Sequence, residues 1–218
     1  DQGNRLVFAK ELKELERTRT INSSRTVTIF PGGEAASLTA RQARDFGVVS
    51  RLVKNRQDLE LLLGLATGDL RIDSQLGNSS LRPRIFLMDR FIDERFVETR
   101  KSMIDRAVRE DGVNFICLWI DRPDGSAAAL SGFADFLSKL DAKEVRTVAY
   151  IPTMARGAIP LVALACDDVV MHPDALLGGK TDSLTNEERS DLLAVVNDNI
   201  VPLKMRNRAL ADAMFTPD

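Results

Sequence analysis

Residues 156–167 could open an active-site helix for acyl-transfer chemistry. They read Arg-Gly-Ala-Ile-Pro and then an apolar run that ends at Cys166 and Asp167. A turn of small residues before a helix presents backbone N–H groups and the positive end of the helix dipole, which stabilise a developing oxyanion. Such a site needs a serine or cysteine at the helix mouth, where this chain has Gly157 or Ala158. The stretch therefore predicts an oxyanion-binding scaffold without a nucleophile.

Two polar residues near this stretch could supply chemistry, and each also has a structural explanation. Ser126 follows Asp124 and Gly125, and either Ser126 or Asp124 can cap a helix that begins there. As a nucleophile, a turn serine without a nearby base is weak at neutral pH. Lys180 follows two glycines near the expected cleft, but a catalytic lysine needs a lowered pKa and a partner. We therefore place Ser126 and Lys180 in the cleft without a catalytic role.

The other candidates for chemistry favour structural roles. His172 ends an apolar run before a proline, and Asp167 and Asp168 are expected to cap a turn. Cys117 and Cys166 both lie in apolar runs and are expected to be buried small side chains rather than a disulfide or metal pair. A single histidine and two cysteines make a zinc site improbable, so neither a metal nor another cofactor is expected.

Composition excludes several classes of function. The 218 residues carry a net charge of -2, and Lys and Arg are interspersed with Asp and Glu, so no basic face for nucleic acid is expected. The proportions of apolar and charged residues are those of an ordinary globular α/β protein. No run of about 18 apolar residues is present, so no membrane span is expected. The polar first residues do not resemble a signal peptide.

The hydrophobic pattern from residue 84 onward predicts alternating strands and helices. We expect strands at 84–88, 115–120, 147–151 and 168–172, and helices at 93–110, 127–140, 157–166 and within 187–214. The run 115–120 is continuously apolar, which is typical of a central parallel strand covered on both faces. The alternation predicts an α/β fold built from βαβ units with right-handed crossovers.

The preceding part of the chain carries shorter elements. We expect a charged helix at 6–17, a strand at 27–30, a turn at 31–33, a strand within 48–53 and a short helix at 57–65. Between them, Thr39 can cap a helix that Gly47 ends. Residues 66–83 are polar and contain glycine, so they are the best candidate for a linker.

Three segments resemble the ClpP/crotonase superfamily, and within it the NfeD-like membrane-associated serine proteases and signal peptide peptidase A. Residues 120–126 are similar to the strand-to-helix turn whose glycine donates an oxyanion N–H in Clp-type peptidases. Residues 155–179 resemble the nucleophile helix, and residues 37–53 are similar to a segment that closes many members. The resemblance implies a ClpP/crotonase-like fold of repeated βαβ units.

The order of these segments is unusual for that superfamily. The closing segment normally follows the core, whereas here it comes first. We therefore interpret the chain as parts of two tandem copies. Residues 1–65 would be the C-terminal part of a first repeat, residues 66–83 a linker, and residues 84–218 the N-terminal core of a second repeat. A fragment of a longer protein is the alternative.

The resemblance also assigns roles to positions. It places the nucleophile position at Gly157 and the oxyanion-hole donors at Gly125 and Ala158. The lysine base of the NfeD-type Ser–Lys dyad would fall near Glu188 or Arg189, and neither is a lysine. Nucleophile and base are thus both absent in this alignment.

These observations favour a catalytically degenerate serine-peptidase-fold module that binds a peptide or protein partner. One alternative is an active membrane-associated serine peptidase whose catalytic residues lie in another repeat. Another is a crotonase-like acyl-CoA hydrolase or isomerase, which would need a carboxylate near the helix mouth; residues 156–165 contain none. The resemblance further implies a homo-oligomer on the extracytoplasmic or periplasmic face of a membrane protein.

Overall fold

The computed structural model describes residues 7, 9–18, 28–30, 35–64, 81–121, 124–181 and 183–216. Two sequence-based expectations fall wholly or largely outside these residues, namely the turn at 31–33 and the linker at 66–83. Residues 122–123 of the turn that was expected to supply an oxyanion donor also lie outside them.

Two sheets form the centre of the molecule. The larger sheet is parallel throughout and has the order β2-β7-β5-β4-β3, with bounds Arg51–Leu52, Asp168–Met171, Arg146–Ile151, Phe115–Ile120 and Pro83–Met88. The smaller sheet has the order β1-β8-β6, with bounds Ser37–Thr39, Leu176–Gly178 and Met154–Ala155. Strand β8 pairs antiparallel with β1 and parallel with β6. The expected parallel α/β architecture is therefore confirmed.

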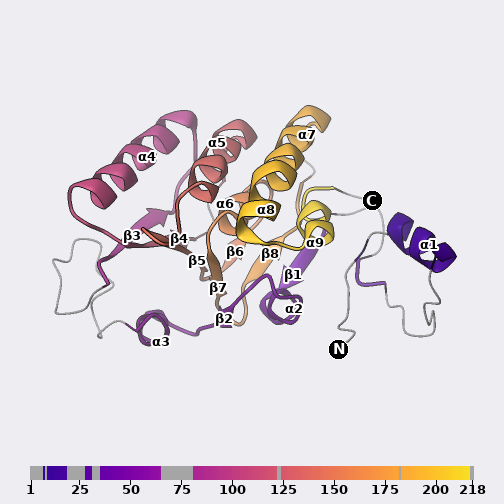
Figure 1. Ribbon diagram of the computed structural model, residues 1–218, viewed down its shortest axis with the longest axis horizontal. Coiled ribbons are helices and arrows are strands. Elements are labelled where there is room, and N and C mark those ends of the chain that lie inside the picture. The colour runs from indigo at the N-terminus through magenta and orange to yellow at the C-terminus, as the bar shows by residue number, and fades with distance from the viewer. Residues whose placement is uncertain are drawn as a thin grey trace.

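The helices that connect the parallel strands cover one face of the larger sheet (Figure 1). Because β3, β4, β5 and β7 follow one another across the sheet, right-handed crossovers place their connecting helices on the same side. Helices α4, α5 and α7 lie there, whereas α3 lies on the opposite side. The helix bounds are α1 Ala9–Thr18, α2 Ala40–Asp45, α3 Arg56–Leu62, α4 Glu94–Arg109, α5 Ala127–Ser138, α6 Pro160–Leu164, α7 Asn186–Val195, α8 Val201–Lys204 and α9 Arg208–Ala213, with a π-helix, η2, at Val196–Ile200.

Side-chain caps explain where several helices begin. Thr39 and Gln42 form the reciprocal pair of hydrogen bonds of a capping box at the start of α2, which confirms the expected cap. The Asp93 carboxylate accepts from the N–H of Phe96 at 2.8 Å at the start of α4. These caps satisfy backbone donors that have no partner within the helix.

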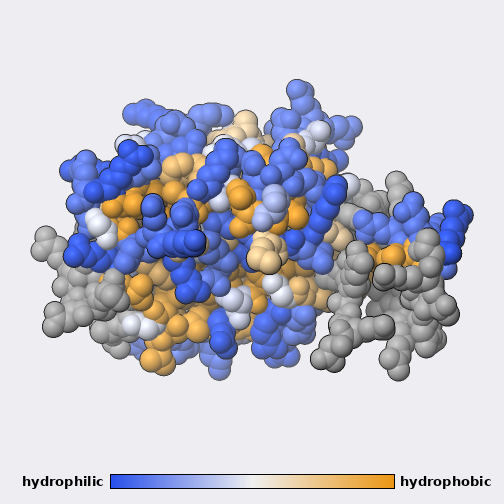
Figure 2. Space-filling view, in the orientation of Figure 1, coloured by the Kyte–Doolittle hydropathy of each residue, from blue (hydrophilic) through white to orange (hydrophobic). Residues whose placement is uncertain are grey.

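The main hydrophobic core lies between the larger sheet and its helical layer. Four residues on the face of α5 that is turned toward the sheet are fully buried: Leu130, Phe133, Ala134 and Leu137. A second apolar cluster covers the opposite face beneath α3 and contains Leu59, Phe115 and Tyr150. This cover is incomplete: Leu61 on α3 is 79% exposed, and apolar surface follows the edge of the molecule where α3 lies (Figure 2).

The structure corrects several expected elements. Residues 28–30 form no strand, and the expected strand at 48–53 is reduced to the two residues of β2. Helix α6 spans only Pro160–Leu164, because residues 157–159 form a turn. Within the expected helical region 187–214, Leu203 is 53% exposed. The wider turn of the π-helix just before it shifts the phase of the buried face.

The segment expected to close the fold joins the core that follows it in sequence. Strand β1 pairs with β8, and β2 pairs with β7. Leu38, Ala43 and Val49 are buried in the same cluster as the central strands. Residues 37–53 therefore complete the sheets formed by residues 83–178, while the division into two repeats stays a prediction.

A buried ion pair fastens α8 to the end of the sheet. The ammonium of Lys204 lies 2.6 Å from one carboxylate oxygen of Asp167, and the two side chains are 4% and 14% exposed. The other oxygen of Asp167 accepts from the backbone N–H and the hydroxyl of Thr147, at 2.7 and 2.8 Å. Asp167 was expected to cap a turn; instead it joins β5, β7 and α8.

We expect Lys204→Met to lower the free energy of unfolding by about 3–5 kcal/mol, since it leaves the Asp167 carboxylate buried without its counter-ion. Urea titration measures this loss. The control is Arg106→Met, which removes an exposed ion pair with Glu110 and should cost no more than about 0.5 kcal/mol. Equal losses in the two variants would contradict the role given to the buried pair.

Candidate functional site

The turn that precedes α6 lies against the end of β8. Strands β6 and β8 run side by side, and the N–H of Gly157 extends their ladder by donating to the carbonyl of Gly179 at 3.0 Å. Gly157 has a φ of 62°, in the left-handed region that favours glycine. A β-carbon at position 157 would have the carbonyl oxygen of Lys180 as its nearest neighbour, at 3.6 Å. The predicted nucleophile position thus has room for a side chain but carries none.

The N–H of Ala158 has no hydrogen-bond acceptor within the described parts of the chain, and Ala158 is only 5% exposed. A buried donor without a partner costs free energy until water or a ligand satisfies it. The geometry of Ala158 therefore suits the oxygen-binding role that the sequence predicts for it.

Gly125, the other expected oxyanion donor, is engaged within its own turn. Its N–H donates to the carboxylate of Asp124 at 2.9 Å. The turn is locked to Ile92, whose N–H donates to the Asp124 carbonyl at 2.7 Å and whose carbonyl accepts from Ser126 at 3.0 Å. A β-carbon at Gly125 would lie 2.7 Å from the Ile92 carbonyl oxygen. Here glycine serves close packing, and its N–H would reach a ligand only if the Asp124 side chain moved.

The hydroxyl of Ser126 has two partners in the structure. It accepts from the N–H of Ala129 at 3.2 Å as the cap of α5, and it donates to the carboxylate of Glu94 at 3.3 Å. The expectation that no basic group lies near Ser126 was wrong, because Glu94 comes from the first turn of α4, 32 residues away. A carboxylate is a far weaker base than a serine alkoxide, so this pair is poorly suited to nucleophilic attack.

His172 and Lys180 also have clear positions. The Nδ1 atom of His172 accepts from the N–H of Asp174 at 3.2 Å, which supports the structural role expected for it. Lys180 is exposed, and its backbone has a φ of 59°. Its carbonyl lies beside Gly157, so the structure brings these two predicted cleft residues together through their backbones.

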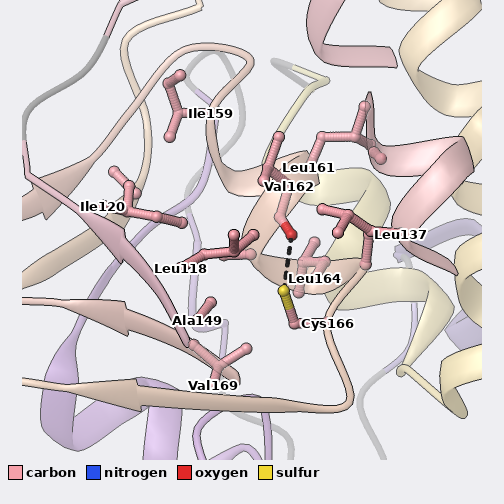
Figure 3. Close-up of a cluster of buried hydrophobic side chains, with 14 of the residues drawn as sticks. Leu118, Ile120, Leu137, Ala149, Ile159, Leu161, Val162, Leu164, Cys166 and Val169 are labelled. Carbon is pink, nitrogen blue, oxygen red and sulfur yellow. Dashed lines mark hydrogen bonds between the residues drawn. The ribbon is translucent and has the colours of Figure 1, made fainter. Parts of the chain in front are cut away.

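Neither cysteine is suited to act as a nucleophile. Both thiols are fully buried, and burial raises the pKa of Cys117 and of Cys166 to about 12. The thiol of Cys166 points to the carbonyl of Val162 at 3.5 Å, among the apolar side chains that pack around α6 (Figure 3). Because the thiolate is the reactive form, both cysteines are expected to be inert.

Arg189 lies close to the turn, in the region where the sequence comparison placed the missing base. Its guanidinium donates to the carbonyl of Thr181 at 2.9 Å, two residues beyond the Gly179 carbonyl that holds Gly157. An arginine is always protonated in proteins and cannot accept a proton as a general base. The position therefore carries a permanent cation.

Sequence reasoning missed one polar pair at the same edge of the larger sheet. The hydroxyl of Thr153, after β5, donates to the carboxylate of Asp121, after β4, at 2.8 Å. Ile120, next to Asp121, faces Ile159 of the turn before α6 (Figure 3). The pair was not visible in the sequence because its members are 32 residues apart and neither belongs to a motif.

No protein-family model and no curated protein sequence matches the chain. Two similar solved structures are of the 1510-N membrane-bound stomatin-specific protease. The first, a serine-to-alanine mutant, has 15% identity and a TM-score of 0.51, and the match covers 63% of this chain and 71% of that one. The second, a lysine-to-alanine mutant in complex with a substrate peptide, has 16% identity and a TM-score of 0.51, with 62% and 66% covered.

The chain has the ClpP-like fold. The resemblance to ClpP-like and NfeD-like proteins is thus confirmed at the level of architecture. None of the helices that the structure describes is both long and apolar enough to cross a membrane. The described residues also contain no group of three or more His, Cys, Asp and Glu that could hold a metal ion.

At the two glycines of the site, substitution by asparagine should compare differently with substitution by alanine in its effect on stability. At position 157, alanine meets no close contact but must adopt a positive φ, which costs about 1–2 kcal/mol, and asparagine tolerates this backbone better. At position 125, both residues collide with Ile92, so Gly125→Asn should be no better than Gly125→Ala. Urea unfolding of the four variants tests this. Rescue by asparagine at position 125, or none at 157, would contradict it.

The cysteines should resist alkylation in the folded protein. With a pKa of about 12, only about one thiol in 10,000 is ionised at pH 8, and both are sealed in the core. We expect iodoacetamide to modify neither cysteine in buffer and both in guanidinium chloride, as counted by intact mass. Rapid modification of either cysteine without denaturant would show that its thiol is accessible in the folded protein and contradict this prediction.

Proposed function

We propose that this chain is a catalytically inactive ClpP-like module that binds a peptide or protein segment beside the turn before α6. The observation that carries the proposal is the state of position 157. A β-carbon would fit at position 157, and the N–H of Ala158 next to it has no acceptor among the described residues, but the residue at 157 is a glycine. Arg189, a permanent cation, lies near that position, and both thiols are buried.

The smaller sheet supports peptide binding as the remaining function. Its strand order leaves β6 as an edge strand, and β6 leads directly into the turn at Gly157. An extended peptide can add to such an edge through backbone hydrogen bonds. One of the structural neighbours is described as a complex with a substrate peptide. Retention of peptide binding after loss of the nucleophile is the simplest functional reading of the geometry.

Three further points belong to this proposal. The structural neighbours are described as membrane-bound proteases, and we propose that this chain is likewise part of a membrane-associated protein with the module on the extracytoplasmic face. We also propose that it assembles with copies of itself, as the superfamily resemblance implies. In a parent with tandem copies, the second copy would supply any peptidase activity.

The inactive state is tested with a fluorophosphonate probe, which labels activated serines. We expect no labelling of the native protein and no cleavage of casein, because Ser126 is held by its cap and by Glu94. The matched control is Ser126→Ala, which should behave identically in both assays. Labelling that Ser126→Ala abolishes, or casein cleavage that the probe blocks, would establish an active serine peptidase instead.

The binding part of the proposal has its own measurement. An array of random twelve-residue peptides is probed with the folded protein, and retention of a subset is expected. The variant Met154→Pro removes one backbone donor from the β6 edge and should reduce retention of the peptides. A proline at Met103 is unsuitable as a control, because it would break α4. Met103→Gln, an exposed change on α4, serves as the control. An array that retains nothing would overturn peptide binding.

A further inference from the structure

A small cavity lies where the C-terminal ends of α2 and α6 meet the connection between α8 and α9 (Figure 1). Its volume is about 160 Å³. An apolar cavity of this order can hold a molecule of the size of benzene. The apolar part of its wall comes from four segments of the chain and consists of Phe46, Val48, Leu164, Ala211 and Met214.

The guanidinium of Arg206 lines the same cavity and is held in a fixed position there. Its Nε atom donates to the carbonyl of Leu164 at 3.2 Å. Its Nη2 atom donates to the carbonyls of Cys166 and Asp167, at 2.6 and 3.2 Å. These bonds occupy carbonyls at the end of α6, whereas the third nitrogen, Nη1, donates to no residue that the structure describes. One edge of the fork thus remains for an acceptor in the cavity.

The described carboxylates whose charge acts on Arg206 already have other partners. They are Asp167, which pairs with Lys204, and Asp168, which pairs with Arg146. Burial lowers the pKa of the Arg206 guanidinium from its ordinary value, although an arginine stays protonated in proteins. Because the group has lost part of its hydration, a hydrogen-bonded anion stabilises it more than it would in bulk water.

The residue next to this arginine, Met205, adopts a backbone conformation that favours glycine. It ends α8 with φ 52° and ψ 38°, in the left-handed region. Met205 is also 92% exposed, although it belongs to the rim of the cavity. The chain thus carries a long apolar side chain where glycine would be more stable. Backbone outliers of this kind cluster at ligand-binding positions, and the unbranched thioether adapts readily to a bound group.

We propose that this cavity binds a small carboxylate with a compact apolar body, such as an aromatic acid. The body lies against the apolar wall, the carboxylate accepts from Nη1 of Arg206, and Met205 covers the mouth. Both parts of the ligand are needed, because a bare anion leaves the apolar wall unfilled and a purely apolar molecule leaves the guanidinium edge without an acceptor. None of the residues that line the cavity belongs to the turn before α6 or to β6, so the inference does not depend on the proposed function.

The probe is benzoate, compared with benzyl alcohol, which has the ring without the charge, and with acetate, which has the charge without the ring. Binding is followed through the ¹³C-labelled methyl groups of the six methionines, of which only Met205 and Met214 line the cavity. Benzoate should shift these two resonances to saturation and bind about tenfold more tightly than benzyl alcohol, because charge-assisted hydrogen bonds are stronger than neutral ones. Acetate should shift neither resonance.

Substitutions assign the binding to the cavity. Ala211→Leu adds a larger side chain to the wall and should abolish the benzoate shifts. Arg206→Gln should remove the preference for benzoate over benzyl alcohol. The matched control is Arg208→Gln, which removes an exposed cation outside the cavity lining and should leave benzoate binding unchanged.

Met205→Gly keeps the test decisive if those cavity variants fail to fold. Glycine suits the left-handed backbone, so the midpoint of urea unfolding should rise. Loss of the side chain that covers the mouth should weaken benzoate binding about threefold. Unchanged benzoate affinity in this variant would overturn the role given to Met205.

The remaining outcomes decide the ligand and the site. Equal affinities for benzoate and benzyl alcohol would overturn carboxylate recognition. Absence of any shift of Met205 and Met214 at about 10 mM benzoate would overturn the site, since even a weak specific complex of a small ligand is populated there. Equal shifts at the exposed Met103 on α4 would show non-specific binding and overturn the site as well. The peptide array and the fluorophosphonate probe judge the proposed function separately from all of these.

Discussion

The hydrogen bond from the N–H of Gly157 to the carbonyl of Gly179 is the contact on which the candidate site depends. It joins the turn before α6 to the end of β8 and so sets where α6 begins. On its other side, Gly179 packs against Ser37 of β1, where a β-carbon would lie only 2.9 Å from the Ser37 side chain. Three segments distant in sequence thus converge at the two glycines. Because these segments lie so close together, glycines occupy the points of contact.

This convergence makes the shape of the turn independent of the side chain at position 157. The backbone geometry is maintained by β6, β8 and β1, and no catalytic side chain takes part in it. A glycine at position 157 therefore leaves the donor at Ala158 in place. Arg189, near the position predicted for a lysine base, is always protonated and cannot accept a proton.

The long elements of the fold were predictable from sequence, and the short ones were not. The strand at Phe115–Ile120 and the helix at Ala127–Ser138 are recognisable from the spacing of their apolar residues and from their length. The cap at Thr39 is recognisable from the residue type at the start of the helix. Strands β1, β6 and β8 have two or three residues each, too few for any hydrophobic period to register. They form because tertiary packing brings their partners to them.

In the candidate site, too, local features were predictable from sequence and long-range contacts were not. The turn at Gly157 was found because its sequence is local, but the pairing of Ser126 with Glu94 was missed, and so was that of Lys204 with Asp167. These partners are 32 and 37 residues apart. Such contacts depend on how helices cross the sheet, which no pattern within a single segment encodes.

The position of strand β2 in the sheet determines when the early part of the chain can fold during synthesis. Ser50, beside it, hydrogen-bonds to Val169, 119 residues later, so the early segment reaches its place only after β7 has been made. At about 5–20 residues per second, the ribosome needs about 6–24 s to cover that interval. During this time Leu38, Ala43 and Val49, which end up inside the molecule, have no native surface to pack on. The nascent chain thus exposes apolar groups long enough for chaperones to bind them.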